Sequence, residues 1–293
     1  MSACRASIVV PTTGDRGPLL PLSVGSALRQ SVGDIEVLVI GDGVDDDTAA
    51  IVESLVEADE RVRFFRFPKD DRRGELNRHE VLTDHARGRI VTYLCDRDLY
   101  LGNHIEAMEQ ALVEADFGHT LRFRVSVDGG FTVNNRIDLR LSGERRRSHR
   151  SPTLVPLTFA GHTLDAYRRL PFGWRTTPSD RATDRYMFEQ FLDQGWVRVG
   201  VRSVPTALTF KRGDHPGWST AQRLEELERW YARLDEPDLV ATLTAELLEV
   251  VDADRGRLEA LLRPRTSEDL RRRLPTPARW AVDATARLAR RVR

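Results

Sequence analysis

The sequence predicts an α/β protein in which a mixed sheet is flanked by helices and followed by a helical C-terminal extension. In the first hundred residues, short runs rich in Val and Ile alternate with longer segments of helical periodicity, which is the pattern of a parallel sheet covered by helices. Farther along, apolar and polar residues alternate on both sides of a Gly-containing turn, which indicates an antiparallel hairpin. Beyond Trp218 the apolar positions recur at helical spacing and almost no strand pattern remains.

Seven elements are expected in the first hundred residues, in strict alternation of strand and helix. Strands are expected at residues 6–11, 35–40, 62–67 and 89–94. Helices are expected at residues 19–30, 48–58 and 75–86. Asp45 and the two acids after it would cap the second helix, and Gly88 would close the third.

The second half of the chain contains a more varied set of expected elements. A helix is expected at residues 103–115, and a hairpin at 119–127 and 131–141 around Asp128, Gly129 and Gly130. The Arg-dense residues 142–152 predict a surface loop, and a strand region is expected at 197–210. We therefore divide the chain into an α/β domain at residues 1–217 and a helical extension at residues 218–293.

The composition narrows the class of protein. Forty-five basic and forty-five acidic side chains leave no net charge, which favours neither nucleic acid nor a strongly acidic partner. Cys4 and Cys95 have no metal-ligand spacing, and no stretch approaches the roughly 18 apolar residues of a membrane span. The N-terminal apolar run is too short for the core of a signal peptide. We expect a cytoplasmic protein that does not bind nucleic acid.

The end of the chain carries a distinct charge pattern. From Arg263 onward there are ten Arg and three acidic residues, and Trp280, Ala284, Leu288 and Val292 fall at four-residue spacing. Such a basic amphipathic helix could make peripheral contact with an anionic membrane. Packing against the rest of the chain, or against a second copy, is an equally good interpretation.

Two aspartates directly follow the fourth expected strand. In a locally extended chain the carboxylates of Asp96 and Asp98 leave on the same side, roughly 6–7 Å apart at Cα. They could then hold Mg²⁺ or Mn²⁺ together with a diphosphate. Alone this pair is weak evidence, because aspartates in such loops commonly stay hydrated or cap a helix. Its position at the carboxyl edge of an open α/β sheet, where ligands bind, strengthens the interpretation.

Three segments, IVVPTTGDR, SALRQSVGDIEVLVIGDGVDDDT and ARGRIVTYLCDRD, together resemble the N-terminal half of the inverting glycosyltransferase family 2. The resemblance implies a GT-A fold and transfer of a sugar from a UDP-, GDP- or dTDP-sugar. The acceptor would be a hydroxyl of a glycan, a glycolipid or a small molecule. By the same resemblance Asp96 would bind the ribose or a metal ion, and Asp98 would bind Mn²⁺ or Mg²⁺.

The resemblance also assigns the nucleotide site. Pro11, Thr12 and Arg16 would border the nucleotide, and Asp42 would hydrogen-bond the base. Without the resemblance, Asp42 would be interpreted as an Asx-turn residue. The family often has an Arg-Asn pair contacting the nucleotide at the position of Arg78 and the histidine after it, and either residue could take this role.

A late segment, FKRGDHPGWS, follows the last expected strand. Some members of the wider GT-A group use a late histidine as a metal or diphosphate contact, and His215 is the candidate here. Lys211 and Arg212 could also steady a leaving diphosphate. The simpler interpretation of His215 is a surface or hydrogen-bonding residue in a turn.

An inverting transfer needs a base for the acceptor hydroxyl. Asp184 is the candidate, because it opens an amphipathic helix and Gly195 lies eleven residues beyond it, which resembles the family's Glu-Asp motif. The Glu position of that motif is Thr183 here. Alternatively, Asp180 and Asp184 merely favour the positive end of a helix dipole.

Two rival functions stay open at this point. A nucleotidyltransferase would use the same fold, but the expected Gly-rich loop with Lys or Arg is missing after the first strand. A non-catalytic scaffold that binds a nucleotide sugar is compatible with Gly41 and Thr183, since both stand where the family has acids. Trp174 and Trp218 could stack on a sugar, although core packing is the simpler role for them.

Overall fold

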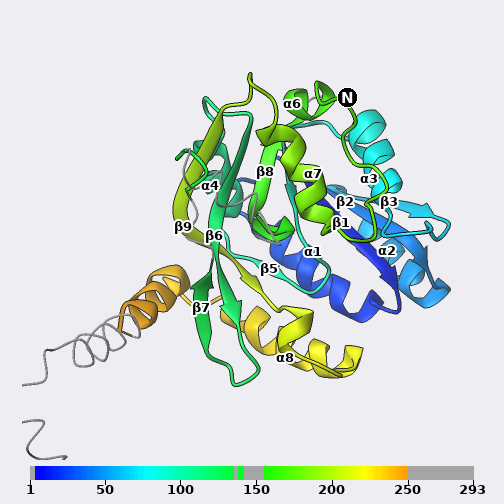
Figure 1. Cartoon of the computed structure of the whole chain (residues 1–293). Coiled ribbons are helices and arrows are strands. Elements are labelled where there is room, and N and C mark those ends of the chain that lie inside the picture. The colour runs from blue at the N-terminus through cyan, green and yellow to red at the C-terminus, as the bar shows by residue number, and fades with distance from the viewer. Residues whose placement is uncertain (1–3, 135–137, 142–154, 250–293) are drawn as a thin grey trace, which may run out of the picture. The chain divides into compact units, whose positions relative to one another are not determined.

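Figure 1 shows the structure, a computed structural model that describes residues 4–134, 138–141 and 155–249 of the 293-residue chain. The strands are β1 (Cys4–Gly14), β2 (Ile35–Val44), β3 (Val62–Phe67), β4 (Gly88–Tyr93), β5 (Leu99–Tyr100), β6 (Phe117–Val125), β7 (Phe131–Asn134), β8 (Ala160–Thr163) and β9 (Val199–Thr209). The α-helices are α1 (Leu20–Leu28), α2 (Asp46–Ala58), α3 (Glu75–Glu80), α4 (His104–Ala111), α6 (Leu164–Arg168), α7 (Thr183–Leu192) and α8 (Thr220–Arg233). Short turns of 3-10 or π helix lie at Gly17–Leu19, Val81–His85, Leu157–Phe159 and Arg212–Asp214.

The described strands form one mixed sheet in the order β3-β2-β1-β4-β8-β6-β9-β5, with β7 paired to β6. The first four strands are parallel, so that Val10 lies opposite Val39 and Val9 lies opposite Tyr93. Strand β8 runs antiparallel to both β4 and β6, whereas β6 and β9 are parallel. The mixed sheet predicted from the sequence is confirmed.

Helices cover both faces of this sheet (Figure 1). On one face Val10 belongs to an apolar cluster with Val24 of α1 and Met108 of α4. Val9, the neighbour of Val10 in β1, belongs to the cluster on the other face, which contains Phe188 of α7. Each of these side chains is fully buried and stabilises the fold by about 1.5–3 kcal/mol. The alternation along β1 therefore fixes three layers, helix, sheet and helix.

Every element predicted in the first 115 residues is present. The side chain of Asp45 caps α2 as predicted and accepts a hydrogen bond from Thr48 N at 2.8 Å. The prediction that Gly88 closes the third helix was wrong, because Gly88 begins β4 instead. A Cβ at Gly88 would lie 2.2 Å from Ser7 N, so the glycine allows β4 to pair closely with β1. The helix ends in the π-helical turn Val81–His85.

Later elements are predicted less completely. The hairpin around Gly129 is confirmed as β6 and β7, and Gly129 has a φ of +81°. The short strands β5 and β8 and helix α6 were not expected. Residues 142–152 and the basic segment from Arg263 lie outside the described residues.

Helix α8 belongs to the same compact unit as the sheet, since residues Met1–Thr244 form one unit. In that unit Arg29 of α1 lies 4.5 Å over the ring of Tyr231 and 2.7 Å from Asp235. The division at residue 217 stays a prediction. From Thr220 to residue 249 the chain is helical apart from a turn at 234–238. In the part of the chain that the structure describes, no helix is long and apolar enough to cross a bilayer.

Candidate functional site

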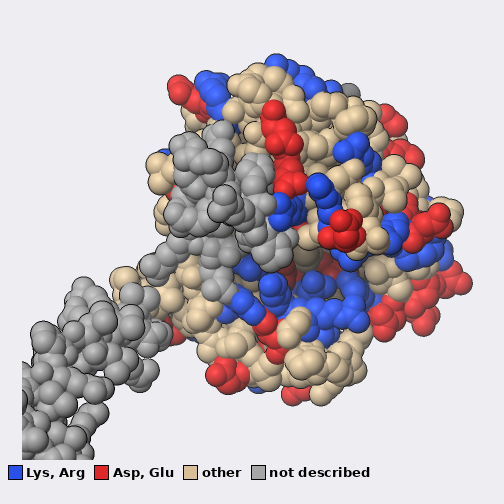
Figure 2. All heavy atoms as spheres, viewed as in Figure 1, with Lys and Arg blue, Asp and Glu red and all other residues tan. Residues whose placement is uncertain are grey.

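A cavity of about 460 Å³ opens at the carboxyl ends of β1, β2 and β4, where the sequence predicts a ligand site. Its lining contains seven basic and three acidic side chains, which suits a ligand with negative charge. Figure 2 shows Lys and Arg gathered around the hollow on this face. The residues of the predicted site that line the cavity are Pro11, Thr12, Arg16, Asp42, Arg78, Asp96 and Asp184. Asp98 and His215 are not part of this lining.

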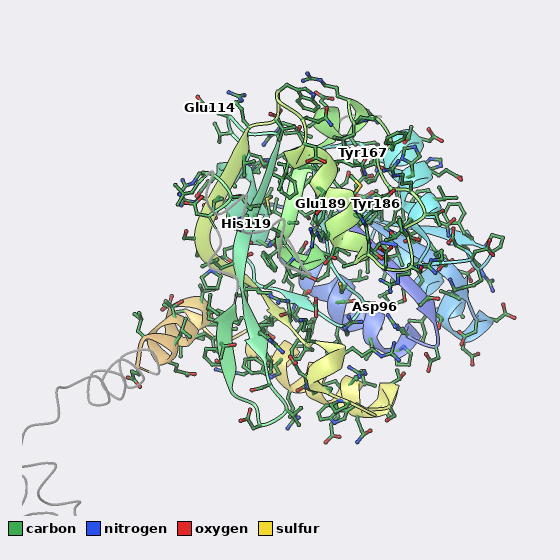
Figure 3. The ribbon with its side chains drawn as sticks, viewed as in Figure 1. Asp96, Glu114, His119, Tyr167, Tyr186 and Glu189 are labelled. Carbon is green, nitrogen blue, oxygen red and sulfur yellow. The ribbon has the colours of Figure 1, made fainter. Side chains whose placement is uncertain are left out.

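Asp96 lies in the cavity wall and is 1% exposed. Thr12 Oγ1 donates a hydrogen bond to Asp96 Oδ2 at 3.2 Å, and Arg16 Nη1 lies 2.9 Å from the same oxygen. The ends of β1 and β4 therefore meet at this cavity. In the view of Figure 3, Asp96 lies between α7, which carries the labelled Tyr186 and Glu189, and α8.

Asp98 diverges from Asp96, contrary to the expectation that both carboxylates leave on one side. The chain is not extended here, because Asp98 N donates to Cys95 O at 2.9 Å and closes a turn. The carboxylate of Asp98 accepts a hydrogen bond from Phe210 N at 3.0 Å and another from the hydroxyl of Thr158. It is 6% exposed, and burial raises the pKa of this carboxyl.

The side chains present do not fit the Mn²⁺ or Mg²⁺ ion that the resemblance implies. In nucleotide sites such an ion is held by one or two carboxylates of the protein together with phosphate oxygens and water. Of the two expected carboxylates only Asp96 reaches the cavity, and Arg16 already pairs with it. Among the described residues, no three His, Cys, Asp or Glu side chains form a group that could hold a metal.

His215 is fully buried in the segment between β9 and α8. Its Nδ1 lies 3.0 Å from Lys211 O, and its Nε2 lies 3.0 Å from Glu226 Oε1. Both ring nitrogens thus have protein partners, so neither is left for a metal ion or a phosphate. The predicted metal role of His215 stays a prediction that this arrangement does not support. Arg212, in contrast, lines the cavity.

Asp42, near the end of β2, organises the loop that follows β3. Its Oδ1 accepts a hydrogen bond from Asp70 N, and its Oδ2 lies 2.6 Å from Lys69 Nζ. These partners lie 27 and 28 residues away in sequence, unlike those of a local Asx turn. A Cβ at Gly74, which has a φ of +68°, would lie 3.0 Å from the side chain of Asp42. Since a carboxylate has about four acceptor positions, Asp42 can still accept from a ligand.

Arg78, rather than the adjacent His79, reaches the cavity. Its Nε donates to Gly74 O at 3.3 Å, and its guanidinium lies 4.5 Å over the ring of Trp174. Burial lowers the pKa of Arg78. Trp174 is 1% exposed and donates from Nε1 to Tyr93 Oη at 3.0 Å. Trp174 is therefore a core side chain that also contributes to the cavity wall.

Asp184, in the first turn of α7, lines the cavity. Burial raises the pKa of this carboxyl, although the guanidinium groups of Arg122 and Arg73 favour its ionised form. A carboxyl group with a raised pKa beside a ligand cavity is a good candidate for a general base. Asp180, the alternative acid before this helix, is exposed and does not line the cavity.

Sequence reasoning missed most of the basic lining. Lys69, Arg72 and Arg73 come from the loop between β3 and α3, and Arg97 stands between the two aspartates. Arg73 Nη1 donates to Thr183 Oγ1 at 2.8 Å and so links this loop to α7. The run KDDRRG carried the signal, but a charged run of this kind usually marks a solvated loop.

An α/β sheet with a cavity at the carboxyl ends of its parallel strands defines a class of protein that binds its ligands at this edge. The chain belongs to the family described as Glycosyl transferase family 2, whose sequence model matches residues 7–172, more than half of the chain. The resemblance seen in the sequence is thereby confirmed.

Two curated relatives come from bacteria. The chain is 31% identical over 106 residues to the GalNAc(5)-diNAcBac-PP-undecaprenol beta-1,3-glucosyltransferase of Campylobacter jejuni. It is 27% identical over 110 residues to the glycosyltransferase GlyG of Streptococcus pneumoniae. These matches cover 36% and 38% of this chain, and 34% and 36% of the relatives. The chain therefore matches about a third of the length of these relatives.

Solved structures of TarS from S. aureus share the fold. TarS 1-349 matches with a TM-score of 0.56 at 17% identity, over 83% of this chain and 70% of that one. The same fragment in complex with UDP-GlcNAc matches with a TM-score of 0.56 over 71% of its length. The GT-A type of α/β fold predicted from the sequence is confirmed.

Proposed function

We propose that this chain transfers a sugar from a nucleoside-diphosphate donor to a hydroxyl acceptor with inversion at the anomeric carbon. The observation that carries the proposal is that Asp184, a carboxyl group with a raised pKa, lines the same cavity as Asp42 and Asp96. A base and a nucleotide-binding edge in one basic cavity are what such a transfer needs. Membership of glycosyl transferase family 2 supports the same chemistry.

The nucleoside of the donor binds at the carboxyl ends of β1 and β2. Pro11 and Thr12 border it. Asp42 accepts a hydrogen bond from an N–H of the base, and Asp96 accepts one from a hydroxyl of the ribose. Arg78 forms the part of the cavity wall next to the loop after β3, which Asp42 holds in place. These roles are supported by the common lining of one cavity and by the hydrogen bonds that fix Asp96 and Asp42.

Asp184 accepts the proton of the acceptor hydroxyl as its oxygen attacks the anomeric carbon. The new carbon–oxygen bond forms on the face opposite the leaving group, and the bond from the anomeric carbon to the phosphate oxygen breaks. The electron pair of that bond leaves with the nucleoside diphosphate. The proposal assigns no role to Mn²⁺ or Mg²⁺, because Asp98 does not line the cavity and the carboxylate of Asp96 pairs with Arg16.

A UDP-sugar is the first donor class to test, followed by GDP- and dTDP-sugars, since the TarS fragment that shares the fold is described in complex with UDP-GlcNAc. A glycan or glycolipid hydroxyl is the proposed acceptor, because the Campylobacter relative is named for an undecaprenol-linked glycan. In this proposal the protein works at the cytoplasmic side of a membrane, held peripherally by its basic C-terminal segment.

The decisive test is nucleoside diphosphate release from each donor class, measured with a bacterial glycolipid extract as acceptor. The Asp184→Asn variant is expected to lose turnover by about a hundred- to ten-thousand-fold while it still binds the nucleotide. Asp180→Asn is the matched control, since Asp180 is exposed, and it is expected to keep full activity. Donor binding without turnover in the wild-type protein would instead support a non-catalytic scaffold.

A further inference from the structure

A second cavity, of about 520 Å³, adjoins the first, and Arg16, Asp96, Arg97 and Arg212 line both. Residues at the start of α8 complete its wall, among them Arg223. We call Arg16, Arg97, Arg212 and Arg223 the arginine cluster. Figure 2 shows the basic side chains gathered at this hollow. Three of these guanidinium groups therefore lie where the two cavities meet, and the fourth, that of Arg223, lines the second cavity.

The arginine cluster has more positive charge than its own acids neutralise. Asp96 lies 2.9 Å from Arg16 and 4.0 Å from Arg97, so two guanidinium groups share one carboxylate. Asp15, the other acid in the wall, accepts a hydrogen bond from Thr220 at 3.2 Å. In the described part of the chain, Nε of Arg97 is buried without a hydrogen-bond partner. A site of this kind favours an anion with several oxygens.

Repulsion among the guanidinium groups of the arginine cluster also favours a bound anion. Partial burial and the nearby charges of Arg97, Arg212 and Arg16 lower the pKa of Arg223. Arg223 is also held in place, since its Nη2 donates to His215 O at 3.1 Å. The like charges are thus kept together by the fold, and a bound anion would relieve their repulsion.

We propose that the arginine cluster binds the diphosphate of the donor and neutralises the leaving nucleoside diphosphate, so that transfer needs no divalent cation. This inference rests on the proposed function. As the anomeric bond breaks, its electron pair stays on the β-phosphate oxygen, and guanidinium groups stabilise that charge by bidentate hydrogen bonds. A dication beside Arg16 and Arg97 would instead be repelled, and Asp98, which lines neither cavity, does not face that position.

The test is calorimetric titration of the full chain, dialysed against EDTA, with UDP, GDP and dTDP and with the matching nucleosides. One diphosphate is expected to bind in EDTA, and added Mn²⁺ is expected to change its Kd by less than about twofold. Arg212→Gln and Arg223→Gln should each weaken that binding by about tenfold or more while nucleoside binding is unchanged. Arg229→Gln is the matched control, because Arg229 is exposed on α8 and lines neither cavity.

Three outcomes would overturn the inference. The first is diphosphate binding that appears only with Mn²⁺ and is lost in Asp98→Asn, which leaves the proposed transfer intact. The second is diphosphate binding by Arg212→Gln with the affinity of the wild-type protein. Arg212 is exposed, so this variant tests the inference even if Arg223→Gln does not fold. The third is that no nucleotide binds under any condition, which rejects the proposed function as well.

Discussion

The imidazole of His215 lies between two acceptors, with Nε2 3.0 Å from Glu226 Oε1 and Nδ1 3.0 Å from Lys211 O. A carboxylate and a carbonyl both accept hydrogen bonds, so each lies where a ring N–H of His215 can donate to it. Glu226 belongs to α8 and is 4% exposed. The pair therefore ties the segment that carries Arg212 to the helix that carries Arg223.

Removing one member of this buried pair should loosen the arginine cluster. Glu226→Ala leaves Nε2 of the buried His215 ring without its partner, and we expect a loss of about 1–3 kcal/mol in the free energy of unfolding. Nucleoside diphosphate binding should weaken more than nucleoside binding. Urea unfolding and calorimetry measure the two effects. Glu228→Ala, at an exposed position of the same helix, should change neither, and equal behaviour of both variants would argue against the role of the pair.

Turnover should depend on the ionisation of Asp184. Its carboxyl pKa is raised above the ordinary value of 3.8, and only the ionised form accepts a proton. We therefore expect kcat to be constant at high pH and to fall about tenfold per pH unit below the raised pKa. Arg73→Gln removes a cation that favours ionisation, so the acid limb should move to higher pH. The control Arg181→Gln should leave the acid limb of the pH profile where it is. If the acid limb also stays unchanged in Arg73→Gln, Asp184 is not the base.

Gly74 should tolerate no side chain. Its φ is +68°, and a Cβ would lie 3.0 Å from Asp42. Gly74→Ala is expected to cost about 1–2 kcal/mol of unfolding free energy from the left-handed backbone and to weaken nucleotide binding by displacing Asp42. At Gly195 nothing lies within 4 Å of a Cβ, so Gly195→Ala should stay within about 0.5 kcal/mol. Thermal unfolding and titration with nucleotide distinguish the two variants.

Acid should destabilise the protein partly through His104. Burial lowers the pKa of His104 to about 3 from 6.5, so below pH 6.5 the unfolded chain binds a proton that the folded chain excludes. The contribution of His104 to stability is complete above pH 6.5 and is lost toward pH 3, at about 1.4 kcal/mol per pH unit. The imidazole stacks on Tyr100 at 3.7 Å, and His104→Phe can keep this contact. Urea unfolding at several pH values between 7 and 4.5 gives the free energy of unfolding as a function of pH. This free energy should fall less steeply with acid in the variant than in the wild type, and equal pH dependences would refute the prediction.

Local pattern was sufficient for the elements that are long and regular. Strands β1 to β4 and the helices between them follow from apolar runs and caps, since each has its signal within its own residues. The two-residue strand β5 has no alternation to detect, and it exists because Leu99 and Tyr100 pair with Leu208 and Ala207 of β9. Strand β8 likewise depends on partners in β4 and β6.

The site was predictable only where the backbone alone decides the outcome. Asp42, Asp96 and Asp184 meet because strand ends and a helix start converge at one edge. The direction of the Asp98 side chain could not be predicted, since it is fixed by Thr158 and Phe210, which lie 60 and 112 residues away. Spacing in the sequence contains no information about such distant partners.

The position of β9 between β6 and β5 has a consequence for the order of assembly on the ribosome. The segment that matches the family, residues 7–172, leaves the ribosome before α7, β9 and the arginines beyond them. A nascent chain of that length contains Asp42 and Asp96 but neither Asp184 nor Arg212. The cavity lined by all four residues can therefore be complete only after α7 and β9 have been synthesised, whereas the four parallel strands are already present in the shorter nascent chain.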